Sequence, residues 1–508
     1  MAPISILFPA TTPVLLGQSS DYSADLRLDQ VEATIMATRG EYNLEGVFFT
    51  PLTTADEVRF RQEIFHDVER RGLKSKIADF AEGMQTVRRL LSGLEKLSTH
   101  RQRQAWLLDA AGIYCDAVDA LVVGLEAAVV ESRGLRAIRE RVSAYVVSDG
   151  YVALRGDAAR VHEALHGVRY SLNVEANSVT VSRYEGDGDY SLEVLRAFER
   201  FRQRHDTEPT PVRAASTYMN HVDAAVLDFV AQLHPEVFSM VDVFCITHSG
   251  FVEETVALFD REIQFYVAVC EFLEQLTAAG LPLCYPEVTD QVKAIDARDV
   301  YDIALADKLV REQRPVVLND VILAEGERIV VVTGANQGGK TTFARMFGQL
   351  HHLAALGCPA PGTQVRVGLF DRIFTHFERT EDLTTLSGKL EDELVRIQRV
   401  LGEATGRSVV VMNESFASTS FHDARLLGTA IVERLIDLDV RAVYVTFVDE
   451  IASLGPTVVS MVSTVAGDDP SRRTFKVLRQ PADGLAYAVC LAELHGLTAR
   501  QLKERIGA

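Results

Sequence analysis

The nine residues from 334 to 342 have types and a spacing that suit phosphate binding. They read Gly-Ala-Asn-Gln-Gly-Gly-Lys-Thr-Thr, which fits the pattern G-x-x-x-x-G-K-[ST]. In such a loop the glycines let backbone N–H groups approach phosphate oxygens, and the following helix adds its positive N-terminal end. We expect Lys340 to reach the β- and γ-phosphates of a nucleotide, and the Thr341 hydroxyl to bind Mg²⁺. The predicted nucleotide-binding residues of this loop are Gly334, Ala335, Asn336, Gln337, Gly338, Gly339, Lys340, Thr341 and Thr342.

The residues on both sides of this loop favour the same interpretation. Residues 328–333 form a short, apolar, β-branched run, and residues 341–347 have the composition of a helix start. Strand, glycine-rich loop and helix is the order that directs a helix N-terminus at phosphate. A chance match in a surface loop would seldom carry both flanks.

A second motif follows about 70 residues later, where the apolar run 409–412 ends in Asn413 and Glu414. A buried parallel strand carries its terminal polar groups to the carboxyl edge of the sheet, beside the phosphate loop. Glu414 is therefore the candidate to orient or deprotonate the attacking water, which makes Glu414 and Lys340 the predicted catalytic residues. Asn413 stands where an aspartate normally helps to hold Mg²⁺. Its amide oxygen can still accept, but it brings no negative charge, so we predict weaker metal binding and slower turnover.

The pattern along the chain predicts two regions of different architecture. Residues 55–97, 105–132 and 253–279 have apolar side chains at helical spacing, and 191–205 predict another helix. Between them, alternation over 168–183 predicts a β-hairpin. After about residue 315 strands and helices alternate, which predicts a parallel-sheet nucleotide-binding domain. The expected strands are 328–333, 372–377, 408–412, 442–447 and 458–465.

Composition narrows the classes of function. The 508 residues carry 52 Lys and Arg against 71 Asp and Glu, a formal charge of −19, so no global basic field attracts nucleic acid. The six cysteines form no C-x-x-C pair, which favours reduced thiols in a cytoplasmic or nucleoid-associated protein over disulfides or zinc. No stretch approaches the roughly 18 apolar residues of a membrane span, and we expect no membrane association.

The motifs are collinear with those of the MutS family of mismatch-repair ATPases, which the second half of the chain resembles over about residues 310–508. The phosphate loop is similar to the family's G-P-N-M-G-G-K-S-T, including its unusual asparagine, here Asn336. Residues 316–320 resemble its F-V-P-N-D, and residues 413–420 stand at its D-E-I-G-R-G-T-S. Shorter similarities lie at 358–360, 372–376, 381–383 and 486–496.

The sequence also departs from the family pattern. Asn413 replaces the aspartate, residues 416–418 replace the Gly-Arg-Gly run, and Phe447 stands at the position of a histidine near the γ-phosphate. Val316 stands where the family has an aromatic residue that stacks on adenine. We find no counterpart of the N-terminal mismatch-reading domain, so mismatch recognition by intercalation is not expected.

The resemblance implies an α + α/β protein. It has a helical core, lever and clamp region over 1–305, then a P-loop ATPase domain of the ABC type over 306–508 with C-terminal dimerisation helices. Two subunits of such ATPases enclose the nucleotide between them, so the resemblance implies a homodimer. It also assigns Thr384, Ser387 and Gly388 to contacts with the partner's nucleotide, and ATP and Mg²⁺ as cofactors.

The leading hypothesis is a MutS-like, ATP-dependent DNA-binding protein of DNA repair or recombination, in which ATP binding and hydrolysis switch a dimeric clamp. A repair protein is a further candidate partner. The hairpin over 168–183 is the candidate clamp tip, with Arg169 and Arg183 as phosphate contacts.

The main alternative is a catalytically weak, nucleotide-gated dimeric scaffold that binds a protein partner instead of DNA. Net acidity, Asn413 and Phe447 favour it. An ATPase of the structural-maintenance-of-chromosomes type would need a far longer coiled coil than the roughly 70 residues between Lys340 and Asn413. His351 and His352 are adjacent, hence on different helix faces, and are interpreted as structural.

Overall fold

The computed structural model describes residues 3–9, 21–175, 178–186, 221–290, 293–378, 389–416, 419–466, 469–482, 497 and 501–502. The chain divides into two compact units. Unit 1 comprises Met1–Pro3, Arg71–Val130 and Ala137–Asp260, and unit 2 comprises Ile4–Arg70, Glu131–Arg136 and Arg261–Ala508. This grouping places the N-terminal helices with the nucleotide-binding region, whereas the sequence suggested a single boundary at 305/306. That boundary stays a prediction.

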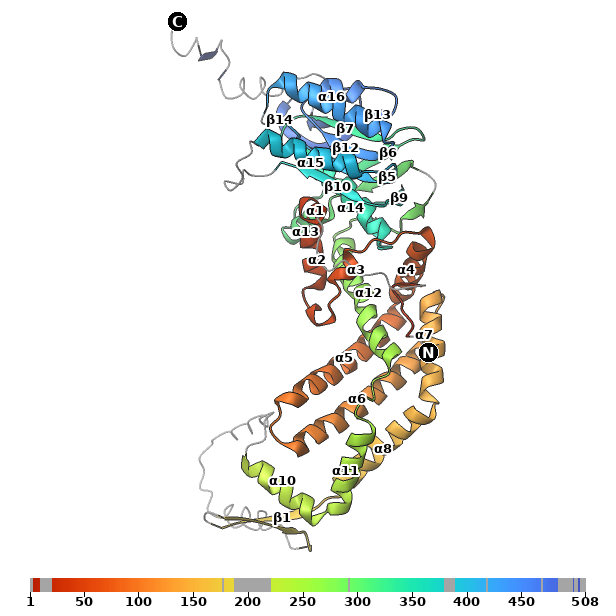
Figure 1. Cartoon of the computed structure of the whole chain (residues 1–508), viewed down its shortest axis with the longest axis vertical. Helices are drawn as coiled ribbons and strands as arrows, with labels where there is room; N and C mark the ends of the chain where they lie inside the picture. The colour runs from red at the N-terminus through yellow and green to blue at the C-terminus, as the bar shows by residue number, and fades with distance from the viewer. Residues whose placement is uncertain are drawn as a thin grey trace, which may run out of the picture. The chain divides into compact units, whose positions relative to one another are not determined.

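Unit 1 is built from long helices. Its elements are α5 (Arg71–Gly93), η2 (Leu94–Lys96), α6 (His100–Ala127), most of α7 (Arg133–Val146), α8 (Asp149–His166), β1 (Tyr170–Glu175), β2 (Ser178–Arg183), α10 (His221–Leu233), α11 (Pro235–Thr247) and the start of α12 (Glu254–Ala278). Helices α5 and α6 lie side by side (Figure 1), so close that a Cβ added to Gly83 would lie 2.9 Å from Ala117 Cβ. The apolar spacing over 55–97 and 105–132 correctly predicted helices, but the first region is two helices, because α4 (Ala55–Val68) ends before α5 begins.

The predicted hairpin is confirmed. Strands β1 and β2 pair antiparallel, from Tyr170 opposite Arg183 to Glu175 opposite Ser178. Most of its side chains are exposed on both faces. The predicted helix over 191–205 lies outside the described residues.

Among the described helices, none could cross a membrane alone. Helices α10 and α11 reach the needed length and apolarity only together, and they meet at a bend of 107°.

Unit 2 combines short helices with three sheets. Its helices are α1 (Asp21–Asp25), α2 (Leu28–Met36), η1 (Gly40–Tyr42), α3 (Glu45–Phe48), α4, the first turn of α7, the larger part of α12, α13 (Ile303–Arg311), α14 (Lys340–Ala355), α15 (Lys389–Glu403), α16 (Phe421–Asp437) and η3 (Asp449–Ser453). Its strands are β3 (Leu283–Cys284), β4 (Glu287–Thr289), β5 (Ile295–Val300), β6 (Asn319–Leu323), β7 (Ile329–Gly334), β8 (Ala360–Pro361), β9 (Gln364–Gly368), β10 (Ile373–Phe377), β11 (Val409–Asn413), β12 (Arg441–Val445), β13 (Val458–Ala466) and β14 (Asp469–Arg479).

The main sheet has the strand order β10-β11-β12-β7-β13-β14. The first five strands are parallel, and β14 pairs antiparallel with β13 at the edge. Helices α15 and α16 lie over one face of the sheet (Figure 1). Together with η3 they cover a core that includes Val331, Val410 and Tyr444. Fully buried Val, Ile and Met side chains alternate along both faces, which is why these runs form central strands of a covered parallel sheet. All five strands predicted from sequence are present, within one or two residues at each end.

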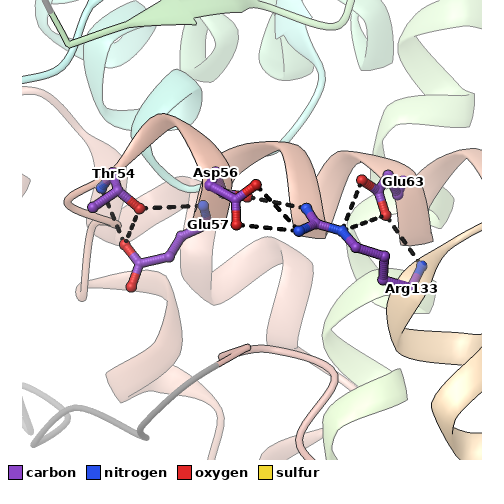
Figure 2. A network of polar contacts seen from close by, with 5 residues as sticks. All are labelled: Thr54, Asp56, Glu57, Glu63 and Arg133. Atoms are coloured by element: carbon purple, nitrogen blue, oxygen red, sulfur yellow. Dashed lines mark hydrogen bonds and ion pairs between the residues drawn. The ribbon is translucent and has the colours of Figure 1, made fainter.

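Polar contacts fix the N-terminal part of unit 2. Thr54 caps α4 through a capping box with Glu57, in which each side chain accepts a backbone N–H of the other residue. Arg133 bridges two carboxylates of α4: its Nε lies 3.1 Å from Glu63, and its Nη1 lies 3.1 Å from Asp56 (Figure 2). Hydrogen bonding to Glu63, then to Asp56, raises the pKa of Arg133. The first turn of α7 is thereby tied to α4.

The five described cysteines form no disulfide. Burial raises the pKa of Cys115, Cys245 and Cys284 to about 11, and that of Cys358 to about 12. These thiols are therefore protonated and unreactive near neutral pH. Cys490 lies outside the described residues.

Candidate nucleotide site

The phosphate loop has the backbone path that its sequence predicts. It leaves β7 at Gly334 and enters α14 at Lys340. Gly334, Gln337 and Gly339 have φ angles of 101°, 60° and 93°. Glycine adopts such left-handed conformations at no steric cost. Helix α14 thus begins directly at the loop, with the orphan N–H groups of its first turn beside it.

Packing from β13 restricts the loop further. Ser463 Oγ donates a hydrogen bond of 3.3 Å to the Ala335 carbonyl. A Cβ on Gly334 would lie 2.7 Å from the Ser463 carbonyl oxygen, and one on Gly338 would lie 2.6 Å from Ser463 Oγ. Both positions therefore require glycine. Sequence reasoning missed Ser463, because its contact follows from the β7–β13 pairing and leaves no local pattern.

Lys340 folds back over this loop. Its Nζ donates to the carbonyl oxygens of Gly334 (2.9 Å) and Ala335 (3.2 Å) and to Asn336 Oδ1 (3.1 Å). Lys340 is only 4% exposed, and burial lowers the pKa of its ammonium group, while the charge of Glu414 opposes that shift. The two predicted catalytic residues are therefore within electrostatic range of each other.

Strand register carries the second motif to the same edge of the sheet. Asn413 lies level with Val445 on β12, and Val445 lies level with Val332 on β7. Glu414 follows with φ 53°, and its N–H donates to the Val445 carbonyl at 3.0 Å. A non-glycine residue in this conformation is strained, and such residues cluster at ligand sites.

The donors at this edge fit a hard divalent cation. Asn413 is 6% exposed, and within the described part of the chain its Oδ1 has no hydrogen-bond partner. Thr341, in the first turn of α14, is half-buried. An amide oxygen and a hydroxyl beside phosphate are acceptable ligands for Mg²⁺, which takes few protein ligands when it binds phosphate. Thr342 has a different contact, because its Oγ1 accepts from Arg345 at 3.4 Å.

Four buried polar side chains support the turn that carries Glu414, and no sequence pattern indicated them as a group. Ser415 Oγ lies 3.1 Å from His376 Nδ1, and it also hydrogen-bonds the Tyr444 hydroxyl, whose pKa burial raises. Glu393 on α15 accepts from the Phe416 N–H at 3.1 Å. Phe416 has φ 65°, so these contacts hold a second strained residue in the turn. The group is a scaffold for Glu414.

The remaining predicted features have mixed outcomes. Phe447, at the position of the family's histidine, is 41% exposed, and its ring centroid lies 6.2 Å from that of Phe421. Thr384, Ser387 and Gly388 lie outside the described residues, as do Ala417, Ser418 and most of the C-terminal segment. His351 and His352 are buried, and each lies within hydrogen-bond distance of a backbone carbonyl.

Residues 330–503 match the family model MutS domain V. The relatives include proteins named DNA mismatch repair protein MutS from Halalkalibacterium halodurans (28% identical over 36% of this chain and 21% of the relative), Ruminiclostridium cellulolyticum (29%, over 42% and 25%) and Synechococcus sp. (30%, over 40% and 23%). The matched part thus spans about a quarter of the length of these relatives. Over residues 330–503 the protein is similar to MutS domain V, and the resemblance to the MutS family predicted from its motifs is confirmed.

Proposed function

We propose that the protein is an ATPase of MutS type, with a P-loop domain of the ABC kind that binds ATP with Mg²⁺. The observation that carries this proposal is the burial of Lys340 over a loop of left-handed glycines, with Glu414 and Asn413 at the same sheet edge. Lys340 binds phosphate oxygens, the loop N–H groups bind the remaining charge, and Glu414 orients the attacking water. Bound Mg²⁺ would neutralise phosphate charge, and Thr341 and Asn413 are the residues that would hold it.

The test is ATP binding by the intact chain and its Lys340→Ala variant. Without the ammonium group, affinity falls at least tenfold, since a charge-assisted hydrogen bond contributes on the order of 1.5–3 kcal/mol. Lys308→Ala is the matched control, because Lys308 is an exposed lysine of α13 whose ammonium group pairs with Glu312 at the end of the same helix. Equal affinity in Lys340→Ala and the parent contradicts the assignment.

The proposed biological setting is ATP-switched DNA binding in repair or recombination by a cytoplasmic homodimer. Support comes from the name shared by the relatives, DNA mismatch repair protein MutS. In the dimer, the segment around Thr384–Gly388 of one subunit contacts the nucleotide of the other. Nucleotide binding then biases the arrangement of a clamp around DNA.

A second candidate, a scaffold for a protein partner, is favoured by the residues of the hairpin taken together with helices α10 and α11. Over 168–186 and 221–250 there are two arginines against six Asp and Glu. Arg183 has a structural contact within the protein. Its Nε and Nη2 donate to the Leu233 carbonyl at 3.0 and 2.5 Å and cap the C-terminal end of α10. Helix α11 exposes the apolar side chains Met240, Val243 and Ile246 along one face. This surface is acidic and apolar, which suits protein contact better than DNA phosphates.

Salt dependence separates the two candidates. If the protein binds DNA through phosphate contacts, the logarithm of the binding constant falls steeply and linearly with the logarithm of salt concentration. If it is a scaffold, duplex DNA shows no saturable binding at low salt, with or without ATP. A nucleotide-dependent DNA affinity with a steep slope would exclude the scaffold.

A further inference from the structure

Arg473 on β14 lies against the phosphate loop, although it is 137 positions away in sequence. Its Nε donates a hydrogen bond of 3.0 Å to the Asn336 carbonyl. Strand β14 reaches the loop because it pairs with β13, which in turn pairs with β7. A second arginine on this strand, Arg479, instead pairs with Glu327. Contact with the phosphate loop is therefore specific to Arg473 and is not shared by Arg479.

Two cations meet at Asn336. Lys340 Nζ donates to Asn336 Oδ1, and Arg473 donates to the backbone oxygen of the same residue. The charge of Arg473 lowers the pKa of Lys340, so the two groups repel each other; the charges of Glu414 and Asp449 act in the opposite direction. An anion of high charge that binds between Lys340 and Arg473 would be attracted by both cations and would reduce their mutual repulsion.

The backbone that follows Arg473 is held in place. Thr474 Oγ1 lies 2.6 Å from Thr464 Oγ1 on β13 and donates to the Thr464 carbonyl at 2.9 Å. Asn319 accepts from the Val477 N–H at 2.8 Å and donates to the Phe475 carbonyl at 3.3 Å. Phe475 has φ 59°, a strained conformation that these bonds maintain. Arg473 is thus positioned before any ligand arrives, which reduces the entropy cost of binding.

We propose that Arg473 is the second cation of the phosphate site and binds the polyphosphate of a nucleoside triphosphate together with Lys340. This inference rests on the proposed ATP binding at the loop. It also follows that part of the phosphate charge is neutralised by protein, at a site where Asn413 supplies no charge to hold Mg²⁺. Polyphosphate therefore binds this chain even when no divalent ion is present.

The experiment measures binding of ATP and of inorganic tripolyphosphate by calorimetry, in excess chelator and in Mg²⁺. Arg473→Ala weakens both ligands by roughly tenfold in chelator, the range of one charge-assisted hydrogen bond, and by less in Mg²⁺. Arg473→Lys, which keeps the charge, recovers part of the affinity. Arg479→Ala, on the same strand, binds like the parent. Melting temperatures show whether each variant is folded.

Two results would overturn the inference while leaving the proposed function in place. One is unchanged binding in Arg473→Ala while Lys340→Ala loses ATP. The other is an equal loss in Arg473→Ala and Arg479→Ala, which indicates a general effect on β14. If the parent chain binds neither ATP nor tripolyphosphate under any condition, the proposed function itself fails, and the role of Arg473 with it.

Discussion

The hydroxyl of Ser463 occupies the space into which a side chain on Gly338 would extend. A Cβ built on Gly338 would lie 2.6 Å from Ser463 Oγ and 2.8 Å from the Ala335 carbonyl oxygen. The same hydroxyl donates a hydrogen bond to that carbonyl oxygen, so strand β13 contacts the phosphate loop directly. If the loop moved away from β13 to make space for a side chain at Gly338, it would lose this hydrogen bond.

Gly338→Ala should therefore lower ATP affinity by at least tenfold, because relief of the overlap displaces the N–H groups that face phosphate. Gly402→Ala is the matched control, since nothing lies within 4 Å of its added Cβ and it lies in α15. Fluorescent-nucleotide titration of both variants checks this. Parent-like affinity in Gly338→Ala would mean that the loop adopts another shape when nucleotide binds.

Asn413→Asp adds a carboxylate beside the expected Mg²⁺ with almost no change in volume. A charge at close range in a site of intermediate dielectric contributes on the order of 1–4 kcal/mol, so the Mg²⁺ requirement should fall and ATP hydrolysis should accelerate. Asn413→Ala, which removes the buried oxygen, should raise the requirement. Steady-state hydrolysis against Mg²⁺ concentration measures both. Slower hydrolysis in Asn413→Asp would show that the site is built around the amide.

Glu414→Gln should retain ATP but hydrolyse it slowly, and so accumulate the ATP-bound form. If two chains share each nucleotide, light scattering of this variant with ATP and Mg²⁺ should give the mass of a dimer. Lys340→Ala, which lacks the phosphate contact, should show no ATP-dependent change in mass. A monomer of Glu414→Gln at saturating ATP would count against a shared site.

Stability should fall in mild acid because two histidines of α14 are buried in the neutral form. Burial lowers the pKa of His351 to about 3 and that of His352 to about 4. His352 Nε2 lies 3.0 Å from the Phe48 carbonyl and Nδ1 lies 3.3 Å from the Tyr22 hydroxyl, an arrangement that the neutral ring satisfies.

The pKa values of both histidines in the folded chain lie below the unfolded value near 6.5. The two neutral rings therefore contribute fully to the free energy of unfolding above about pH 6.5, and this contribution is lost as pH falls toward 4. Each histidine should remove about 1.4 kcal/mol of unfolding free energy per pH unit in this window. His352→Gln does not titrate, so the drop in its melting temperature between pH 7 and pH 5 should be smaller than in the parent. An identical drop would mean that His352 titrates normally in the folded chain.

The sequence was sufficient for features that depend on local pattern. The run 329–333 became a central strand because its β-branched residues suit a sheet covered on both faces, and the glycines after it could adopt positive φ. Alternation over 168–183 likewise predicted the hairpin, although not its register.

Features that depend on tertiary contact could not be predicted in this way. Helical spacing continues from Val58 to Phe80, yet the helix breaks after Val68, where Asp67 accepts the N–H groups of Glu131 and Ser132. The approach of Arg473 to Asn336 depends on strand order, which no local pattern specifies. Nor did any local pattern predict that Arg183 caps α10; its role as a phosphate contact stays a prediction.

The raised pKa values of four thiols, together with the burial of Cys270, should make the described cysteines react slowly with maleimide dyes. Cys115, Cys245, Cys284 and Cys358 hold their protons well above neutral pH, so they should label slowly while the protein is folded. With Cys490 replaced by serine, a single cysteine introduced at Ile246, whose side chain is 80% exposed, could carry one fluorophore. The fluorescence of this dye on α11 then distinguishes a protein partner from DNA. A change on addition of a basic peptide, with no change on addition of duplex DNA, would indicate that the chain binds protein.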